Sequence, residues 1–344
     1  MRRQTLLLTF ALAAASFAAV PPDIATKLHE MGPVLDVPGV AKLYRPLQPT
    51  PPYPGVKVER NIKYVDTDRT VLDVFSPEKG GGKRPVLIYV SGGAGNKMEP
   101  VPDGDAFYDN IMLWAVKNGM TGVNVQRRAG GQGLEWNETA KDIGRVIDWV
   151  QQNISKYKGN PDRVFIWAHS AGTGPTSTYV GHPELYGPKG VGLKGVVLMG
   201  TPAFNIAPVT VPGRGAGPGG PPKGGPPPDG KSGPPDAKGD GKGGKGKGGG
   251  RGFTPLDPAT QLARSNLPGL LKVDIPIFLG AGELDLPGVA QFHEILKDQL
   301  CMVKHCPTVA IFKDHSHVSE VFSPNTADDS VTGPILKWMK SAKK

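Results

Sequence analysis

A serine lies between an apolar run and a helical segment near the middle of the chain. Residues 163–168 read Arg-Val-Phe-Ile-Trp-Ala, which is typical of a strand buried on both faces, and His169-Ser170-Ala171-Gly172 follows directly. A small-x-Ser-x-Gly pattern between a strand and a helix predicts a sharp turn that strains the serine backbone and presents its hydroxyl at the carboxyl end of a sheet. Ala168 replaces the usual glycine but is still small. The pattern predicts Ser170 as a nucleophile.

Apolar runs of strand length alternate with helical patterns along the chain. Strands are expected at Val58–Val65, Thr70–Phe75, Pro85–Val90, Gly122–Gln126, Arg163–Ala168, Gly195–Met199, Ile275–Gly280 and Thr308–Phe312. Helices are expected at Asp105–Lys117, Glu138–Ile154 (with Asn137 as its N-cap) and Gly288–Leu300. This alternation predicts an α/β fold with a doubly wound, mostly parallel sheet. The first two strands, joined by a turn at residues 66–69, predict an antiparallel hairpin at its edge.

The net charge of +9 is unevenly distributed. Residues 213–252 hold 18 Gly, 8 Pro and a net charge of +5, and lack large apolar side chains. We therefore expect a disordered, solvated insertion within a domain spanning residues 58–344. Arg2 and Arg3 add two more charges, so the rest of the chain is nearly neutral and does not indicate nucleic-acid binding. The insertion is either simply tolerated or a contact for an acidic polymer or anionic surface.

The N-terminus reads as an export signal. Arg2 and Arg3 precede an apolar run at Leu6–Ala15, and Ser16-Phe17-Ala18 offers small residues at cleavage-site positions. Residues 1–18 are thus predicted to be a signal peptide, with a retained anchor as the alternative, and the mature chain to be secreted or periplasmic without an integral membrane segment. Residues 19–57 are rich in proline and are expected to form a lead-in arm packed on the surface of the domain.

The two cysteines are close in sequence. Cys301 and Cys306 could form a disulfide in an oxidising compartment, which would tie the end of a helix to the strand starting near Thr308. A metal site is less favoured, because the spacing is not CxxC and only His305 lies near.

The segment around the serine resembles a known family. Residues 157–163, Tyr-Lys-Gly-Asn-Pro-Asp-Arg, leading into 168–172, Ala-His-Ser-Ala-Gly, are similar to the α/β-hydrolase esterase/lipase group, and within it to small secreted carboxylesterases and acetyl- and feruloyl-esterase-like enzymes. The resemblance covers roughly residues 58–340 apart from the insertion. It implies ester hydrolysis without a metal or organic cofactor.

The resemblance also implies a catalytic acid and a base. The family's acid falls on Asp285, with Glu283 on the same loop as the alternative. The family's histidine falls on His317, with His315 as the alternative. The order Ser, Asp, His along the chain fits the α/β-hydrolases. A metal site formed by Asp314, His315 and His317 is the competing interpretation, but no further ligand cluster is apparent in the sequence.

Ser91-Gly92-Gly93 follows the strand at Pro85–Val90, where the family has a His-Gly-Gly-Gly loop. The backbone amides of Gly92, Gly93 and Ala171 are therefore candidates for an oxyanion hole, with an ordinary strand-to-loop turn as the alternative. Ser91 replaces the family's histidine, which puts the anchoring of this loop in doubt.

The expected reaction is hydrolysis of carboxylic esters with short acyl chains, including acyl groups on carbohydrate. A peptidase or amidase of the same fold and a non-catalytic binding protein are the alternatives. His169 is expected to be a buried structural imidazole beside the serine turn. Six aromatic residues are candidates either for a substrate pocket or for the core: Phe107, Tyr108, Trp114, Trp136, Phe204 and Phe253.

Overall fold

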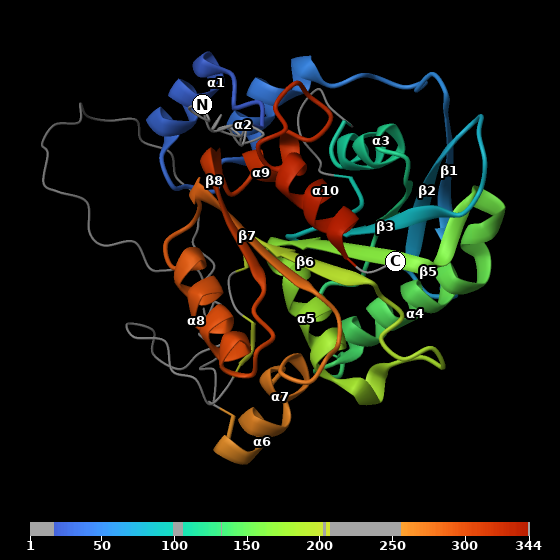
Figure 1. Cartoon of the computed structure of the whole chain (residues 1–344), viewed down its shortest axis with the longest axis vertical. Helices are drawn as coiled ribbons and strands as arrows, with labels where there is room; N and C mark the ends of the chain where they lie inside the picture. The colour runs from blue at the N-terminus through green and yellow to red at the C-terminus, as the bar shows by residue number, and fades with distance from the viewer. Residues whose placement is uncertain (1–16, 99–105, 132, 202–203, 207–255, 343–344) are drawn as a thin grey trace, which may run out of the picture.

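An eight-stranded sheet forms the centre of the computed structural model, which describes residues 17–98, 106–131, 133–201, 204–206 and 256–342 (Figure 1). The strand order is β1-β2-β4-β3-β5-β6-β7-β8. The strands are β1 (Val56–Lys63), β2 (Val71–Pro77), β3 (Arg84–Val90), β4 (Thr121–Val125), β5 (Gly159–His169), β6 (Gly195–Met199), β7 (Ile277–Leu284) and β8 (Thr308–Ser316). β1, β2 and β4 pair antiparallel, and all pairs from β4 to β8 are parallel.

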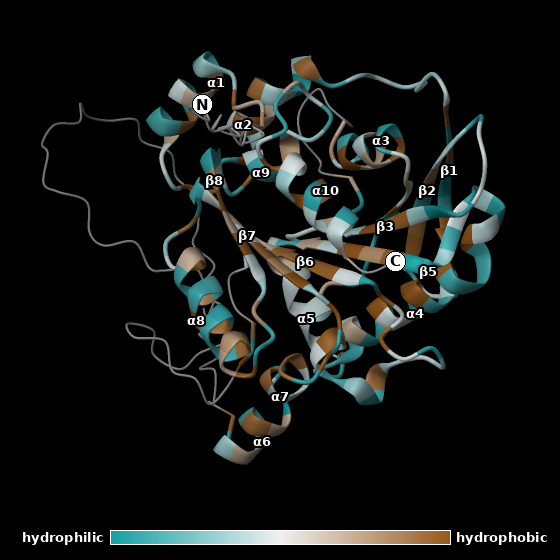
Figure 2. Cartoon of the chain, viewed as in Figure 1, coloured by the Kyte–Doolittle hydropathy of each residue, from teal (hydrophilic) through white to brown (hydrophobic). Residues whose placement is uncertain are grey.

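Helices cover both faces of the sheet (Figure 1). Their bounds are α1 (Pro22–Met31), α2 (Val37–Tyr44), α3 (Asp109–Lys117), α4 (Glu138–Asn153), α5 (Thr173–Gly181), α6 (Pro258–Ala263), α7 (Leu267–Leu270), α8 (Val289–Met302), α9 (Ser319–Phe322) and α10 (Thr332–Ser341). Buried side chains of α1, α2, α3, α9 and α10 form one core layer, and those of α4, α5, α7 and α8 form the other. The central strands are accordingly apolar, whereas the outer helix faces are polar (Figure 2).

The predicted fold class is confirmed. The sheet is mostly parallel and doubly wound, and the N-terminal hairpin is antiparallel. β5 starts at Gly159 rather than Arg163, because Gly159 pairs with Arg84 at the start of β3. Asn137 occupies the predicted N-cap position of α4, but its side chain makes no capping hydrogen bond.

The N-terminal arm is helical, which the sequence did not indicate. Residues 19–57, expected to lie on the surface, contain α1, α2 and a 3-10 turn at Arg45–Leu47. Leu28 and Tyr44 are completely buried in the core layer that they share with α9 and α10. Pro22, Pro38 and Pro46 do not prevent this arrangement, because they stand in the first turns of these helices, where a missing amide costs no hydrogen bond.

Some predicted segments lie outside the described residues. These are residues 1–16 of the predicted signal peptide, the 213–252 insertion and Phe253. Within the described ranges, no helix combines the length and apolar character needed to cross a membrane.

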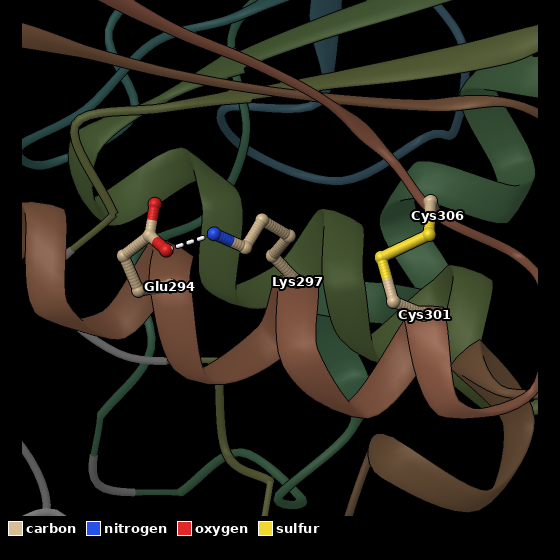
Figure 3. Close-up of a disulfide and its surroundings, with 4 residues drawn as sticks. All are labelled: Glu294, Lys297, Cys301 and Cys306. Atoms are coloured by element: carbon tan, nitrogen blue, oxygen red, sulfur yellow. Dashed lines mark hydrogen bonds and ion pairs between the residues drawn. A yellow bond between two sulfur atoms is a disulfide. The ribbon is translucent and has the colours of Figure 1, made fainter.

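A disulfide joins the end of α8 to the start of β8 (Figure 3). Cys301 lies in the last turn of α8, and Cys306 lies two residues before the start of β8. One turn earlier on α8, Lys297 forms an ion pair with Glu294. The bond therefore links the two elements that the sequence predicted, and it closes a short loop.

His293 predicts how stability depends on pH. This α8 side chain is buried, and burial lowers its pKa to about 4 from 6.5. Between pH 6.5 and 4, His293 therefore binds a proton in the unfolded chain but stays neutral in the folded chain. The contribution of neutral His293 to the free energy of unfolding is fully present above pH 6.5 and is lost as the pH decreases towards 4. We expect His293→Leu to reduce the loss of unfolding free energy between pH 7 and 4 by up to about 3 kcal/mol. Urea unfolding at fixed pH values measures this, and an unchanged pH slope would contradict it.

Candidate active site

Ser170 lies at the turn between β5 and α5. Its φ of +52° is in the left-handed region, a conformation that costs a non-glycine residue about 1–3 kcal/mol. Gly172 allows this turn to pack against the end of β3, because a Cβ there would lie 2.5 Å from the carbonyl oxygens of Val90 and Ser91. The small residues of the motif thus let strand and helix approach closely, while Ser170 remains partly exposed.

Two loops at the carboxyl ends of β7 and β8 bring further side chains to Ser170. The Ser170 hydroxyl donates to His317 Nε2 over 2.8 Å. His317 Nδ1 donates to Asp285 Oδ1 over 2.7 Å, and both of these side chains are buried. Because a buried carboxylate fixes the imidazole tautomer, His317 Nε2 is left free to accept the serine proton. The arrangement can therefore activate a hydroxyl for attack on a carbonyl carbon.

The structure places the alternative acid and base elsewhere. His315 is fully buried and contacts the hydroxyls of Ser319 and Ser330 at 3.0 and 2.9 Å. Glu283 accepts the backbone amide of Asp314 at the surface. Asp314 itself contacts His29 on α1. Since Asp314, His315 and His317 have separate partners, the structure does not assemble the metal site considered from the sequence.

The glycine loop after β3 lies directly beside the serine. A Cβ added at Gly92 would be 2.6 Å from Ser170 Cβ and 3.2 Å from its Oγ. Gly93 and Ala171 are exposed next to it, so their backbone is accessible to a ligand. This proximity is what an oxyanion hole at Gly92, Gly93 and Ala171 requires.

Buried polar contacts hold this loop. The Ser91 hydroxyl donates to the Asn96 carbonyl over 2.5 Å, which supplies an anchor in place of the family's histidine. Lys97, at the end of the loop, is buried and pairs with Asp73 of β2 over 2.9 Å. Asn124 of β4 donates to the Lys97 carbonyl. Sequence reasoning missed Lys97 and Asp73, because nothing local in the sequence indicates that they meet.

His169, next to the serine, is only 4% exposed, and its Nε2 donates to the backbone carbonyl of His317 over 2.9 Å. Burial and the neighbouring His317 hold the pKa of His169 well below its usual value, so its imidazole is neutral. Glu320 of α9 lies 3.1 Å from the same nitrogen and is completely buried. Sequence reasoning missed this second carboxyl.

The candidate aromatic residues belong mostly to the core. Phe107 stacks on Phe322 with ring centroids 3.7 Å apart. Tyr108, Trp114 and Phe204 are also buried. Trp136 is partly exposed, but it lines a surface hollow together with Arg264 rather than the space around Ser170.

Part of the chain is similar in sequence to known proteins. The family model BD-FAE matches residues 72–180, which include β2 to α5 and the Ser170 turn. Human (Homo sapiens) cocaine esterase is 33% identical over 130 residues, covering 35% of this chain and 22% of the relative. The chain spans a quarter or less of the length of the first curated relatives that it matches.

Solved structures share the fold over most of the chain. Esterase B from Lactobacillus rhamnosis has a TM-score of 0.57 at 14% identity, covering 87% of this chain and 88% of the other. A carbohydrate esterase from gut microbiota, in truncated form, has a TM-score of 0.53 at 14% identity, covering 90% and 99%. The fold is therefore that of the α/β-hydrolases. The sequence matches agree with this fold over the part of the chain that they cover.

Proposed function

We propose that this protein is a serine esterase that cleaves carboxylic esters with short acyl chains. The continuous chain of hydrogen bonds from Ser170 through His317 to Asp285, next to the glycine loop, carries the proposal. The sequence matches support it, because they include proteins named as esterases and hydrolases.

The geometry defines a role for each group. His317 takes the Ser170 proton as the hydroxyl oxygen attacks the ester carbonyl, and Asp285 stabilises the imidazolium that forms. The amides of Gly92, Gly93 and Ala171 bind the oxyanion of the tetrahedral intermediate. Collapse of the intermediate transfers the proton to the leaving alcohol and leaves an acyl group on Ser170. Water, deprotonated by His317, then attacks this acyl-enzyme and releases the acid.

The physiological setting is part of the proposal. Residues 1–18 support export to the cell surface, the periplasm or the medium. We favour acyl groups on carbohydrate as natural substrates, since one structure of the same fold is named as a carbohydrate esterase. The lysines of residues 213–252 would add affinity for an acidic polymer.

A substrate panel tests the reaction class. We expect turnover of p-nitrophenyl acetate and butyrate, slower turnover of the decanoate, and at least ~100-fold slower cleavage of the matching acetyl and butyryl p-nitroanilides, because only the anilides need an efficient proton donor to the leaving amine. Comparable rates on esters and anilides would favour an amidase. A folded protein that is inert on the whole panel would contradict the proposed function.

A further inference from the structure

A second carboxyl group lies close to His317 and His169, below the surface. Glu320 is three residues after His317, on the short helix α9, and its side chain has no solvent exposure. A carboxylate oxygen of Glu320 and a ring nitrogen of His317 lie within 4.8 Å of each other, and a ring nitrogen of His169 lies within the same distance of both. Because unpaired buried charges are costly, a carboxyl at this position calls for a physical explanation.

Gly200, which follows β6, shows how directly the carboxyl faces the imidazole. A Cβ added at Gly200 would lie 2.7 Å from Glu320 Oε1 and 2.8 Å from His317 Cε1. It would also lie 2.9 Å from His317 Nδ1, the atom that donates to Asp285. The absent side chain of Gly200 therefore leaves the carboxyl and the Nδ1 edge of the imidazole bordering the same small space.

Burial and the nearby Asp285 together favour the protonated form of this carboxyl. Burial, with the nearby charge of Asp285 as the second cause, raises the pKa of Glu320 well above its ordinary value, and the Gly282 amide opposes this only weakly. Two carboxyls around one imidazole do not both ionise readily, since each negative charge disfavours the other. Asp285 makes the 2.7 Å hydrogen bond to His317, while Glu320 is biased towards its protonated form.

We propose that Glu320 is a second acid for His317: a positioning residue, buried beside the Nδ1 edge of the imidazole, that takes over the orientation of the imidazole when the Asp285 carboxylate is removed. This inference rests on the proposed esterase function. Loss of the Asp285 charge removes the second cause of the raised Glu320 pKa while the burial remains, so this pKa falls and a negative charge forms beside His317 at the alkaline end of the pH range. Replacement of Asp285 should therefore lower kcat/KM less than the same replacement does in a triad that has only one carboxylate near its histidine.

A double-mutant cycle tests this proposal on p-nitrophenyl acetate between pH 6 and 10. Asp285→Asn should lower kcat/KM by about 10²–10³, less than the roughly 10⁴ seen where a triad has one carboxylate. Glu320→Gln alone should lower kcat/KM by a factor of about 3. In the Asp285→Asn background the same substitution should lower kcat/KM by a factor at least ~10 times larger. The Asp285→Asn profile should also show an acidic limb that disappears in the double variant. His169, Asp285 and His317 are the titratable groups facing Glu320, and the first is neutral.

Glu283→Gln, a neighbouring surface carboxyl, is the matched control and should add nothing to Asp285→Asn. If Glu320→Gln has the same small effect with and without Asp285, Glu320 is only structural and the proposal is wrong. Activity of the parent protein that disappears in Ser170→Ala establishes the proposed function independently of this cycle.

Urea unfolding of the same variants gives a readout that does not need catalysis. When a carboxyl has a higher pKa in the folded chain than in the unfolded chain, it ionises first in the unfolded chain. The free energy of unfolding therefore falls as the pH rises above the pKa of the unfolded chain. The part of this loss that Glu320→Gln abolishes should be smaller in the Asp285→Asn background. An equal loss in both backgrounds would show that Asp285 does not control Glu320, and would overturn the proposal.

Discussion

Ser170→Ala is expected to lower kcat/KM for p-nitrophenyl acetate by about 10⁵–10⁶, with little change in the melting temperature. The hydroxyl is the group that His317 activates, and its loss leaves neither a nucleophile nor an acyl-enzyme. The melting temperature should stay close to that of the parent, because alanine keeps the strained backbone of the turn and removes only one partly exposed hydroxyl. Steady-state kinetics and thermal unfolding of the purified variant measure the two effects.

Ser155→Ala is the matched control for this substitution. Ser155 is exposed on a 3-10 turn at Ile154–Tyr157. Its replacement by alanine should leave kcat/KM unchanged. If Ser170→Ala kept more than a hundredth of the parent rate, another residue would have to be the nucleophile.

Gly92→Ala should produce the next largest loss, with kcat falling by about 10²–10³. The added methyl would lie 2.6 Å from Ser170 Cβ and 3.3 Å from the His169 carbonyl, so either the loop or the serine must move. A shift of the loop displaces the amides that are to bind the oxyanion. Because the change affects the transition state more than the bound substrate, KM should change little.

Gly174→Ala, one turn along α5 from the serine, controls for the glycine replacement itself. A Cβ at Gly174 would have no heavy atom within 4 Å, so the parent kcat should be retained. A Gly92→Ala variant with the parent kcat would remove this loop from the proposed oxyanion hole.

The parts of the fold that were predictable have a local signal. β3 and β6 are continuous apolar runs because both faces of these strands are covered, and α4 has one apolar stripe because one side of it is covered. The Ser170 turn was recognisable because its small residues are all required within one short segment. The loops after the last two strands could be identified only through the family resemblance, which left Glu283 and His315 as alternatives.

The features that escaped prediction depend on distant parts of the chain. The proline-rich arm suggested a surface segment, whereas its apolar residues pack against α9 and α10, more than 270 positions away. The Lys97–Asp73 ion pair joins a loop to a neighbouring strand, and Glu320 meets Asp285 only where the ends of β7 and β8 adjoin. In each case the individual residue types are unremarkable, and only the sheet order brings them together.

Covalent labelling tests the central claim, that Ser170 is a nucleophile activated by His317, most directly. The folded protein is incubated with a fluorophosphonate probe, digested, and analysed by mass spectrometry. The proposed mechanism predicts one phosphonyl adduct, on the peptide that contains Ser170, and its absence in Ser170→Ala. An adduct on a different residue, or no adduct on the folded protein, would contradict the mechanism.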